Sequence, residues 1–285
     1  MTTTDRAPRH PPLPTLGLGT WRMGENPRHR AAEVAAVRLA IELGYRLIDT
    51  AEMYGEGGAE SVVGEAVAQA LRAGDVTREA LCIVSKVYPH HADRRGVPQA
   101  CGRSLARLGL DRIDVYLLHW RGDVPLAETV DAFERLVDVG CIARWGVSNF
   151  DLSDMAELVS VAGGRGCATN QVYFSLGERG AAYSLLPWLR ERGLPLMAYS
   201  PIDQGVLAQA EVLRAVGARH GASAAQVALA WVLAQPGVVA IPKAVDPQHL
   251  RENLAARDLE LDADDLVRLD RAFPPPARKR PLAMI

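Results

Sequence analysis

Short apolar runs alternate with amphipathic stretches along nearly all of this 285-residue chain. Eight runs rich in Val, Ile, Leu and Tyr have the composition of parallel strands buried on both faces: Leu16–Thr20, Leu47–Ala51, Leu81–Lys86, Val115–His119, Trp145–Ser148, Cys167–Val172, Leu196–Ser200 and Val238–Lys243. Apolar residues at helical spacing predict helices between and after them: Arg30–Leu43 (ending at Gly44), Ala59–Leu71, Gln99–Leu108, Leu126–Val139, Asp151–Val161, Ala181–Arg192, Ala222–Ala234, Pro247–Ala255 and Asp262–Phe273. Eight strand–helix units in one chain predict an α/β fold of the (β/α)₈ TIM-barrel type, in a single domain.

A doubly wound sheet is the main alternative to the barrel. That fold usually carries a G-x-G-x-x-G turn after its first strand, where the pyrophosphate of a dinucleotide binds. The segment 16–21 has two of these glycines, Gly17 and Gly19, but lacks the third. We therefore expect residues 10–285 to form one barrel and the polar, proline-rich residues 1–9 to be disordered.

Composition limits the partners of the protein. A net charge of −2 and a pI of about 6.4 give no reason to expect nucleic acid or an anionic membrane surface as a partner. No apolar stretch reaches the length of a transmembrane helix, and the N-terminus lacks the apolar core of a signal peptide. A cytoplasmic monomer is expected. The cysteines, at positions 82, 101, 141 and 167, form no C-x-x-C pair, so no metal site is expected.

Four polar residues stand at or just after the ends of three predicted strands: Asp49, Tyr54, Lys86 and His119. Ligands bind at the carboxyl ends of the strands in barrels and open α/β sheets, so these side chains are expected to meet in one cleft. Lys86 is one of only three lysines among 32 basic residues, which suggests that a compact ammonium is required there.

Each of these residues has an ordinary structural explanation when it is considered alone. An Asp after a strand often caps a helix, and a His beside leucines is more often a satisfied core residue than a catalyst. Together, however, they can deliver a proton to a carbonyl oxygen. A free tyrosine has a pKa of about 10, which a neighbouring ammonium is expected to lower. We therefore expect Lys86, held by Asp49, to activate Tyr54, while His119 orients the substrate.

The later strands end in residues suited to a flat nucleotide. The side chains of Ser148, Asn149 and Gln171 could hold a carboxamide, and the ring of Tyr199, which precedes Ser200 and Pro201, could stack on a heterocycle. The run Ile241-Pro242-Lys243 is followed by a predicted helix start at Pro247. Phosphates often bind at this place in such barrels.

The sequence resembles the aldo-keto reductase superfamily, most closely its bacterial, methylglyoxal-reductase-like members. The matching blocks run in the family's order and cover nearly the whole chain: Leu16–Trp21, Asp49–Gly55, Ser85–Lys86, Leu117–His119, Gly146–Phe150, Asn170–Gln171, Ala198–Pro201, Ile241–Lys243 and Glu252–Asn253. The resemblance implies a (β/α)₈ barrel that binds NADPH without a Rossmann fold and reduces small aldehydes or ketones.

The resemblance also implies residue roles. Tyr54 would be the general acid, Lys86 and Asp49 would tune it, and His119 would orient the carbonyl. The implied cofactor contacts are Gly19, Thr20, Trp21, Ser148, Asn149, Gln171, Tyr199, Ser200, Pro201, Ile202, Leu207, Ile241, Lys243, His249, Glu252 and Asn253. Trp21, Met53 and Trp120 would form the wall of the substrate pocket.

The sequence departs from the family pattern near the phosphate-binding residues and at its C-terminal end. Ala244 replaces a common Ser, His249 replaces a common Arg, and Asp246 adds a negative charge nearby. We therefore expect only a modest preference for NADPH, with NADH as a weaker cofactor. Residues 274–285 are expected to be too short to form a deep lid, which predicts broad specificity for small aldehydes.

Two other functions remain open at this point. Some relatives of this barrel are non-catalytic, nucleotide-binding regulatory subunits of membrane channels, but all four catalytic residues are present here. A metal-dependent hydrolase would need His and carboxylate ligands clustered at the strand ends. Of the seven histidines, only His119 ends a predicted strand, which disfavours the hydrolase.

Overall fold

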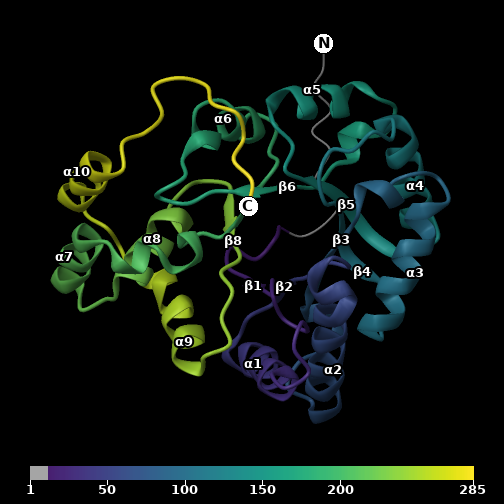
Figure 1. Cartoon of the computed structure of the whole chain (residues 1–285), viewed down its shortest axis with the longest axis horizontal. Coiled ribbons are helices and arrows are strands. Elements are labelled where there is room, and N and C mark those ends of the chain that lie inside the picture. Colours follow the sequence, from purple (N-terminus) through teal and green to yellow (C-terminus); the bar gives the residue numbers. More distant parts are fainter. Residues whose placement is uncertain (1–11) are drawn as a thin grey trace.

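The computed structural model describes residues 12–285, and the expectation of disorder for residues 1–9 lies outside this range. Eight parallel strands form one curled sheet in the order in which they occur along the chain. They are β1 (Leu18–Gly19), β2 (Leu47–Asp49), β3 (Cys82–Val87), β4 (Ile113–Leu118), β5 (Ile142–Ser148), β6 (Asn170–Tyr173), β7 (Leu196–Tyr199) and β8 (Val238–Ala240). Helices surround this sheet (Figure 1). The predicted α/β class and strand order are confirmed.

Backbone hydrogen bonds also join the two ends of the sheet. The Gly17 N–H donates to Ala240 O at 2.8 Å, and the Gly19 N–H donates to Pro242 O at 3.0 Å. A Cβ atom on Gly19 would lie 2.7 Å from the Ile241 carbonyl oxygen. Glycine is therefore required at position 19 for β1 to approach the segment after β8 this closely.

The helices are α1 (Arg30–Leu43), α2 (Gly58–Ala73), α3 (Gly96–Leu108), α4 (Leu126–Asp138), α5 (Leu152–Ser160), α6 (Leu185–Arg190), α7 (Glu211–His220), α8 (Ala224–Leu233), α9 (Pro247–Ala255) and α10 (Ala263–Ala272). Helix α1 ends at Gly44, which has a φ of 103°, as its sequence predicts. None of the helices among the described residues is long and apolar enough to span a membrane.

Two helical segments differ from the prediction. The expected helix at Ala181–Arg192 is instead a 3₁₀ turn, Gly180–Ala182, followed by the short α6. Proline at position 187 lacks an N–H and therefore favours the first turn of a new helix over the interior of a long one. Helix α7 was missed, although Leu213 and Val216 face the core at helical spacing and Gly221 ends the helix with a φ of 64°.

The strand pleat places the polar site above an apolar layer. Within the curled sheet, Leu47 of β2 and Val84 of β3 pack with apolar residues from the other strands. Side chains alternate between the two faces of a strand, so Asp49 and Lys86 point to the same inner side two residues later. Ser85, between Val84 and Lys86, points outward toward the helices. The apolar interior is thus closed by charged groups at the carboxyl ends of the strands.

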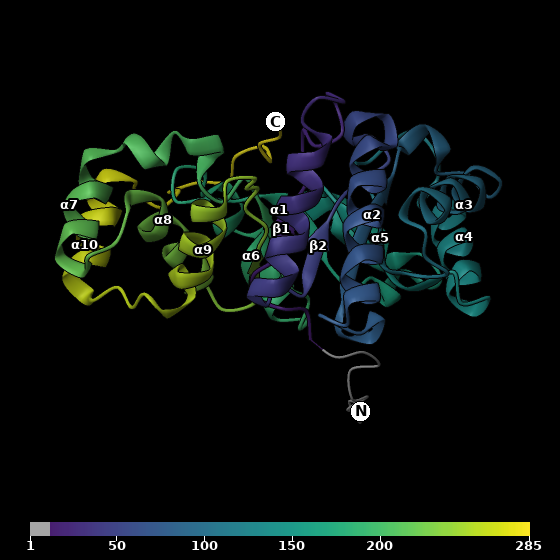
Figure 2. The same cartoon turned by 90° about the horizontal axis from the view of Figure 1, so that it is seen from below.

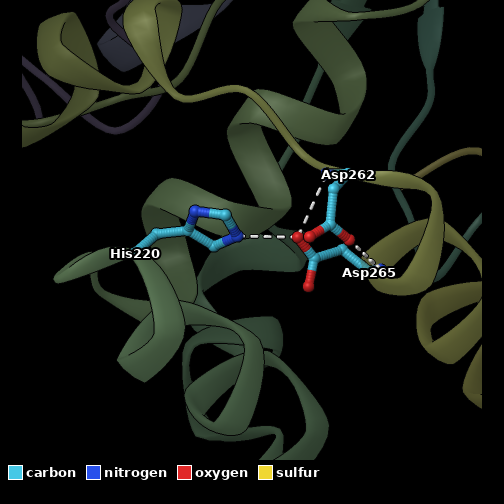
Figure 3. Close-up of side chains that lie close together, drawn as sticks. All are labelled: His220, Asp262 and Asp265. Carbon is cyan, nitrogen blue, oxygen red and sulfur yellow. Dashed lines mark hydrogen bonds and ion pairs between the residues drawn. The ribbon is translucent and has the colours of Figure 1, made fainter.

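A polar cluster ties α7 to α10 (Figure 3). The His220 Nε2 and Asp265 Oδ2 atoms lie 2.6 Å apart, and Arg219 pairs with both Asp262 and Asp265. Asp262 and Asp265 also form a capping box at the start of α10. His220, Asp262 and Asp265 have side chains of the kind that bind metals. Because the Arg219 guanidinium already pairs with both carboxylates, we interpret the cluster as a structural ion-pair network.

We expect Asp265→Ala to lower the free energy of unfolding by about 2 kcal/mol, because the fully buried Asp265 both caps α10 and pairs with α7. Urea denaturation measures this change. Asp264→Ala, an exposed change in the same helical turn, should cost less than about 1 kcal/mol. Equal effects of the two substitutions would refute a special role for Asp265.

Candidate active site

A cavity of about 620 Å³ opens at the carboxyl ends of the strands. Most of the residues selected from the sequence line it: Gly19, Trp21, Asp49, Met53, Tyr54, His119, Trp120, Ser148, Asn149, Gln171, Tyr199, Ser200, Pro201, Ile202, Ile241, Lys243, His249, Glu252 and Asn253. They come from the ends of every strand except β3 and from α9, so only the curled arrangement of the sheet brings them together.

The Lys86 ammonium is the centre of a buried hydrogen-bond network. Its Nζ atom lies 2.8 Å from Asp49 Oδ2, 2.9 Å from the Thr50 carbonyl oxygen and 3.0 Å from the Tyr54 hydroxyl. Lys86 is fully buried and Asp49 nearly so, whereas Tyr54 is partly exposed to the cavity. An ammonium has three N–H donors, and each has one acceptor here. Lys86 itself does not line the cavity and acts from behind Tyr54.

Burial dominates the ionisation of this network. It raises the pKa of Tyr54 above that of a free phenol, and the charge of Lys86 offsets only part of the rise. Lys86 lowers the pKa of Tyr54, as expected, but the loss of solvent outweighs this one ammonium. Burial would lower the pKa of Lys86, but Asp49 and Tyr54 together hold that pKa above its usual value. At neutral pH, Tyr54 keeps its proton and Lys86 keeps its charge.

His119 lies beside Tyr54, with ring centroids 5.8 Å apart and ring planes at 74°. Burial, assisted by the charge of Lys86, holds the pKa of His119 well below its usual value. The imidazole is therefore neutral at neutral pH and can donate only from one ring nitrogen. A neutral imidazole can orient a carbonyl oxygen, whereas the proton that is transferred is better supplied by Tyr54.

Gln171 connects the network to the next part of the cavity. Its Nε2 atom donates to Asp49 Oδ1 at 2.7 Å and lies 2.9 Å from Met197 Sδ. This leaves its carbonyl oxygen as the acceptor available to a ligand. The Ser148 hydroxyl donates to the Gln171 backbone carbonyl, and Asn149 Nδ2 donates to the His119 carbonyl oxygen. The side-chain oxygens of Ser148 and Asn149 retain lone pairs, so they can accept hydrogen bonds from the carboxamide of a nicotinamide.

The Tyr199 ring lines the cavity and is fixed from two directions. It stacks on the ring of Tyr173, with centroids 5.8 Å apart and planes at 12°. Its hydroxyl donates to Asn149 Oδ1 at 2.9 Å. A flat aromatic surface held in this way is suited to stack on another planar ring.

The other end of the cavity carries a positive charge and a helix start. Lys243 and His249 are exposed and line this end. Asp246, which was expected to repel a phosphate, caps α9 by accepting hydrogen bonds from the backbone N–H groups of Gln248 and His249. Those bonds lower the pKa of Asp246, so its negative charge remains, but the side chain does not line the cavity.

Two of the selected cofactor residues do not line the cavity. The Thr20 hydroxyl donates to the Asp49 carbonyl oxygen at 2.9 Å, and Leu207 packs in the core while its neighbour Ala208 reaches the cavity. The residues that sequence reasoning missed are Arg22, Gln204, Gly205, Ala208, Ala225, Pro242, Met284 and Ile285. Of these, Arg22, Ala208 and Pro242 lie next to selected residues, and Pro242 stands inside the motif Ile241–Lys243, which could have indicated it.

The C-terminal segment reaches the cavity. It runs from α10 to the middle of the sheet (Figure 1), where Met284 and Ile285 line the cavity. The Ile285 backbone lies within hydrogen-bonding reach of the Tyr199 hydroxyl. At the start of the segment, Arg179 donates to the Phe273 carbonyl oxygen at 2.6 Å. The length of the segment alone did not reveal this path, because the path depends on where α10 ends.

We expect Lys86→Arg to reduce carbonyl-reducing activity nearly as much as Lys86→Met, each by about 100-fold or more. A guanidinium keeps the charge, but its planar fork cannot meet three acceptors arranged around one nitrogen in a closed space. Steady-state kcat of the two variants measures this. Wild-type kcat in Lys86→Arg would show that charge alone is sufficient.

The comparisons with known proteins agree with this site. The aldo/keto reductase family model matches residues 15–273. The chain is 49% identical to the methylglyoxal reductase YeaE of Escherichia coli, over 96% of this chain and 95% of the relative. It is 36% identical to the glyoxal reductase of Bacillus subtilis, over 90% and 88% of the two chains.

Solved structures agree as well. A crystal structure of an aldo/keto reductase from Klebsiella pneumoniae in complex with NADP and acetate superimposes with a TM-score of 0.91, at 49% identity, over 96% of each chain. A second Klebsiella pneumoniae structure, in complex with NADPH, gives a TM-score of 0.90 over 96% of this chain and 95% of that chain, also at 49% identity. The chain belongs to the aldo/keto reductase family.

Proposed function

We propose that this protein is an NADPH-dependent reductase of small aldehydes and ketones. The observation that carries the proposal is the Tyr54 hydroxyl, which lies 3.0 Å from the buried Lys86 ammonium at a cavity wall that it shares with His119. We further infer that residues 10–285 form one closed (β/α)₈ barrel, which the hydrogen bonds between the chain at Gly17 and Gly19 and the chain at Ala240 and Pro242 support.

In the proposed reaction, the substrate carbonyl oxygen lies between Tyr54 and His119. His119, being neutral, donates a hydrogen bond that orients the oxygen. Tyr54 gives up its phenolic proton as negative charge develops on that oxygen, and Lys86 stabilises the resulting phenolate. Asp49 keeps Lys86 charged and in place. The bound nicotinamide would supply the hydride.

The residues present fit NADPH. The free carbonyl oxygen of Gln171, together with Ser148 and Asn149, would hold the carboxamide, and Tyr199 would stack on the ring. Lys243 would bind the 2′-phosphate, while Glu252 and Asn253 face the same end of the cavity and would bind the adenine. Thr20 and Leu207, which do not line the cavity, would support the site rather than contact the nucleotide.

Small neutral carbonyl compounds suit the wall beside Tyr54. Trp21, Met53 and Trp120 line the cavity, and Met284 and Ile285 add apolar surface from the C-terminal segment. The names of the relatives, methylglyoxal reductase and glyoxal reductase, point to the same class of substrate. All four proposed catalytic residues, Asp49, Tyr54, Lys86 and His119, are present, which disfavours a purely regulatory subunit. A regulatory subunit would not need a buried Lys–Asp pair against a tyrosine hydroxyl.

We also propose that the protein acts as a monomer in the cytoplasm. Residues of a single chain complete the cavity, and the four cysteines are free thiols, which suits a reducing compartment. Size-exclusion chromatography with light scattering tests the oligomeric state, and a peak at twice the mass of the chain would contradict the proposal.

Tyr54→Phe should lower kcat for methylglyoxal by about 100-fold or more, because only the proton donor is lost. NADPH binding, followed by fluorescence, should stay within about twofold of wild type, since the change removes a single hydroxyl that lies outside the nucleotide contacts. The comparison should be repeated with a slow aromatic aldehyde, for which the chemical step limits turnover. A variant that retains more than half of wild-type kcat would rule out Tyr54 as the acid.

His249→Arg should increase the preference for NADPH over NADH, because a guanidinium can bind a phosphate through two N–H groups. Dissociation constants for both nucleotides measure this preference. Gln248→Arg, next to it but outside the cavity lining, is the matched control. Tighter binding of NADH than of NADPH by the wild type would show that the phosphate site is misplaced.

A further inference from the structure

The turn that follows Tyr54 is held in an unfavourable conformation. Gly55, Glu56 and Gly57 have φ angles of 57°, 50° and 86°, so three successive residues are left-handed. A side chain such as that of Glu56 makes this conformation costly, and it persists only where the surrounding structure enforces it. The turn begins at the proposed proton donor, so whatever holds the turn also determines where the Tyr54 hydroxyl lies.

The turn is clamped from two sides. A Cβ atom on Gly55 would lie 2.9 Å from the Gly24 carbonyl carbon, and one on Gly57 would lie 2.4 Å from Arg107 Nε. The backbone of the chain after β1 therefore supports one side, and the end of the Arg107 side chain, from α3, packs closely against the other. Since Arg107 has a long and flexible side chain, it can support the turn only if its guanidinium is fixed.

Glu60 fixes Arg107 and connects it to the strand that carries Lys86. Its Oε2 accepts from Arg107 Nε at 2.6 Å, and its Oε1 accepts from the Ser85 hydroxyl at 2.5 Å. Glu60 and Ser85 are fully buried, and the Arg107 side chain is 25% exposed. The pleat of β3 turns Ser85 outward to Glu60 and the next residue, Lys86, inward to Tyr54.

These contacts form a closed circuit around the proton donor. It runs from Lys86 through Ser85, Glu60 and Arg107 to the turn at Gly57, and back from Tyr54 to Lys86. We propose that Glu60, through Ser85 and Arg107, is a positioning residue that sets the distance between the Tyr54 hydroxyl and the Lys86 ammonium. Glu60 lies outside the cavity and touches neither substrate nor cofactor.

Tyr54 and Lys86 lie on different elements, and the single 3.0 Å hydrogen bond between them is too weak to fix the distance between those elements by itself. Misplacement of a reacting group by about 1 Å can cost roughly 100-fold in rate. A buried carboxylate with one partner on β3 and another on α3 resists displacement in both directions, because moving away would leave a charge without a partner.

Glu60→Gln tests the proposal directly. The amide oxygen of glutamine can still accept from Arg107 and its NH₂ group can donate to the Ser85 hydroxyl, so this change removes the negative charge that fixes Arg107 while side-chain volume is kept. Ser85→Ala removes only the hydrogen bond between Glu60 and β3, and Arg107→Met removes only the ion pair between Glu60 and α3. The matched controls are Glu65→Gln and Arg30→Met, which break an exposed ion pair of 2.8 Å that also involves α2. Should Glu60→Gln fail to fold, Ser85→Ala, which removes one hydroxyl, decides the question.

The measurements are kcat and KM for methylglyoxal, the NADPH dissociation constant, the solvent deuterium isotope effect on kcat, and the thermal midpoint. We expect Glu60→Gln to lower kcat roughly 10-fold or more and to increase the solvent isotope effect, since proton transfer becomes harder. KM and NADPH binding should stay within about twofold of wild type. Ser85→Ala should show the same pattern to a smaller extent, and the two controls should show none of it.

Two results would overturn the proposal. In one, Glu60→Gln and Ser85→Ala lower the thermal midpoint but keep wild-type kcat and isotope effect, so that Glu60 serves stability alone. In the other, kcat and NADPH affinity fall together, so that the whole cavity is distorted. The inference rests on the proposed function, whose own test is separate: wild-type turnover and its loss in Tyr54→Phe establish the reaction before any Glu60 variant is compared.

Discussion

The site depends on one buried ammonium. Lys86 would be costly to bury alone, but its three N–H groups meet the Asp49 carboxylate, the Thr50 carbonyl oxygen and the Tyr54 hydroxyl. Because each acceptor belongs to the β2 strand or the segment after it, the ammonium joins two neighbouring strand ends. The same contact that satisfies the charge also places it against the phenol, so the stability of this end of the sheet and the proposed chemistry require the same arrangement.

Burial also determines the protonation states of the groups in the site. It keeps the Tyr54 phenol protonated and the His119 imidazole neutral, which leaves Tyr54 as the group able to deliver a proton and His119 as a hydrogen-bond donor. In the proposed reaction, Lys86 stabilises the phenolate as it forms rather than ionising Tyr54 beforehand. A dry site of this kind makes one positive charge effective, because little water competes for it.

Around this centre, the fold supplies support from several elements. Gln171 carries a hydrogen bond from Asp49 to the part of the cavity where a carboxamide would bind. Glu60 joins the strand of Lys86 to the turn after Tyr54 from the opposite side. The C-terminal segment adds Met284 and Ile285 to the cavity wall. Each contact joins parts of the chain that are distant in sequence, and each limits how the catalytic groups can move.

The sequence alone predicted the eight strands, their order and the four polar residues at their ends, because strand burial and pleat are local consequences of apolar patterning. It missed α7, predicted one long helix where a 3₁₀ turn and the short α6 occur, and selected Leu207 for the cavity, which Ala208 lines instead. Only the tertiary structure decided the direction of the Tyr54 pKa, the path of residues 274–285 and the partners of Glu60. Burial, chain path and long-range pairing depend on residues far apart in sequence, which no local pattern records.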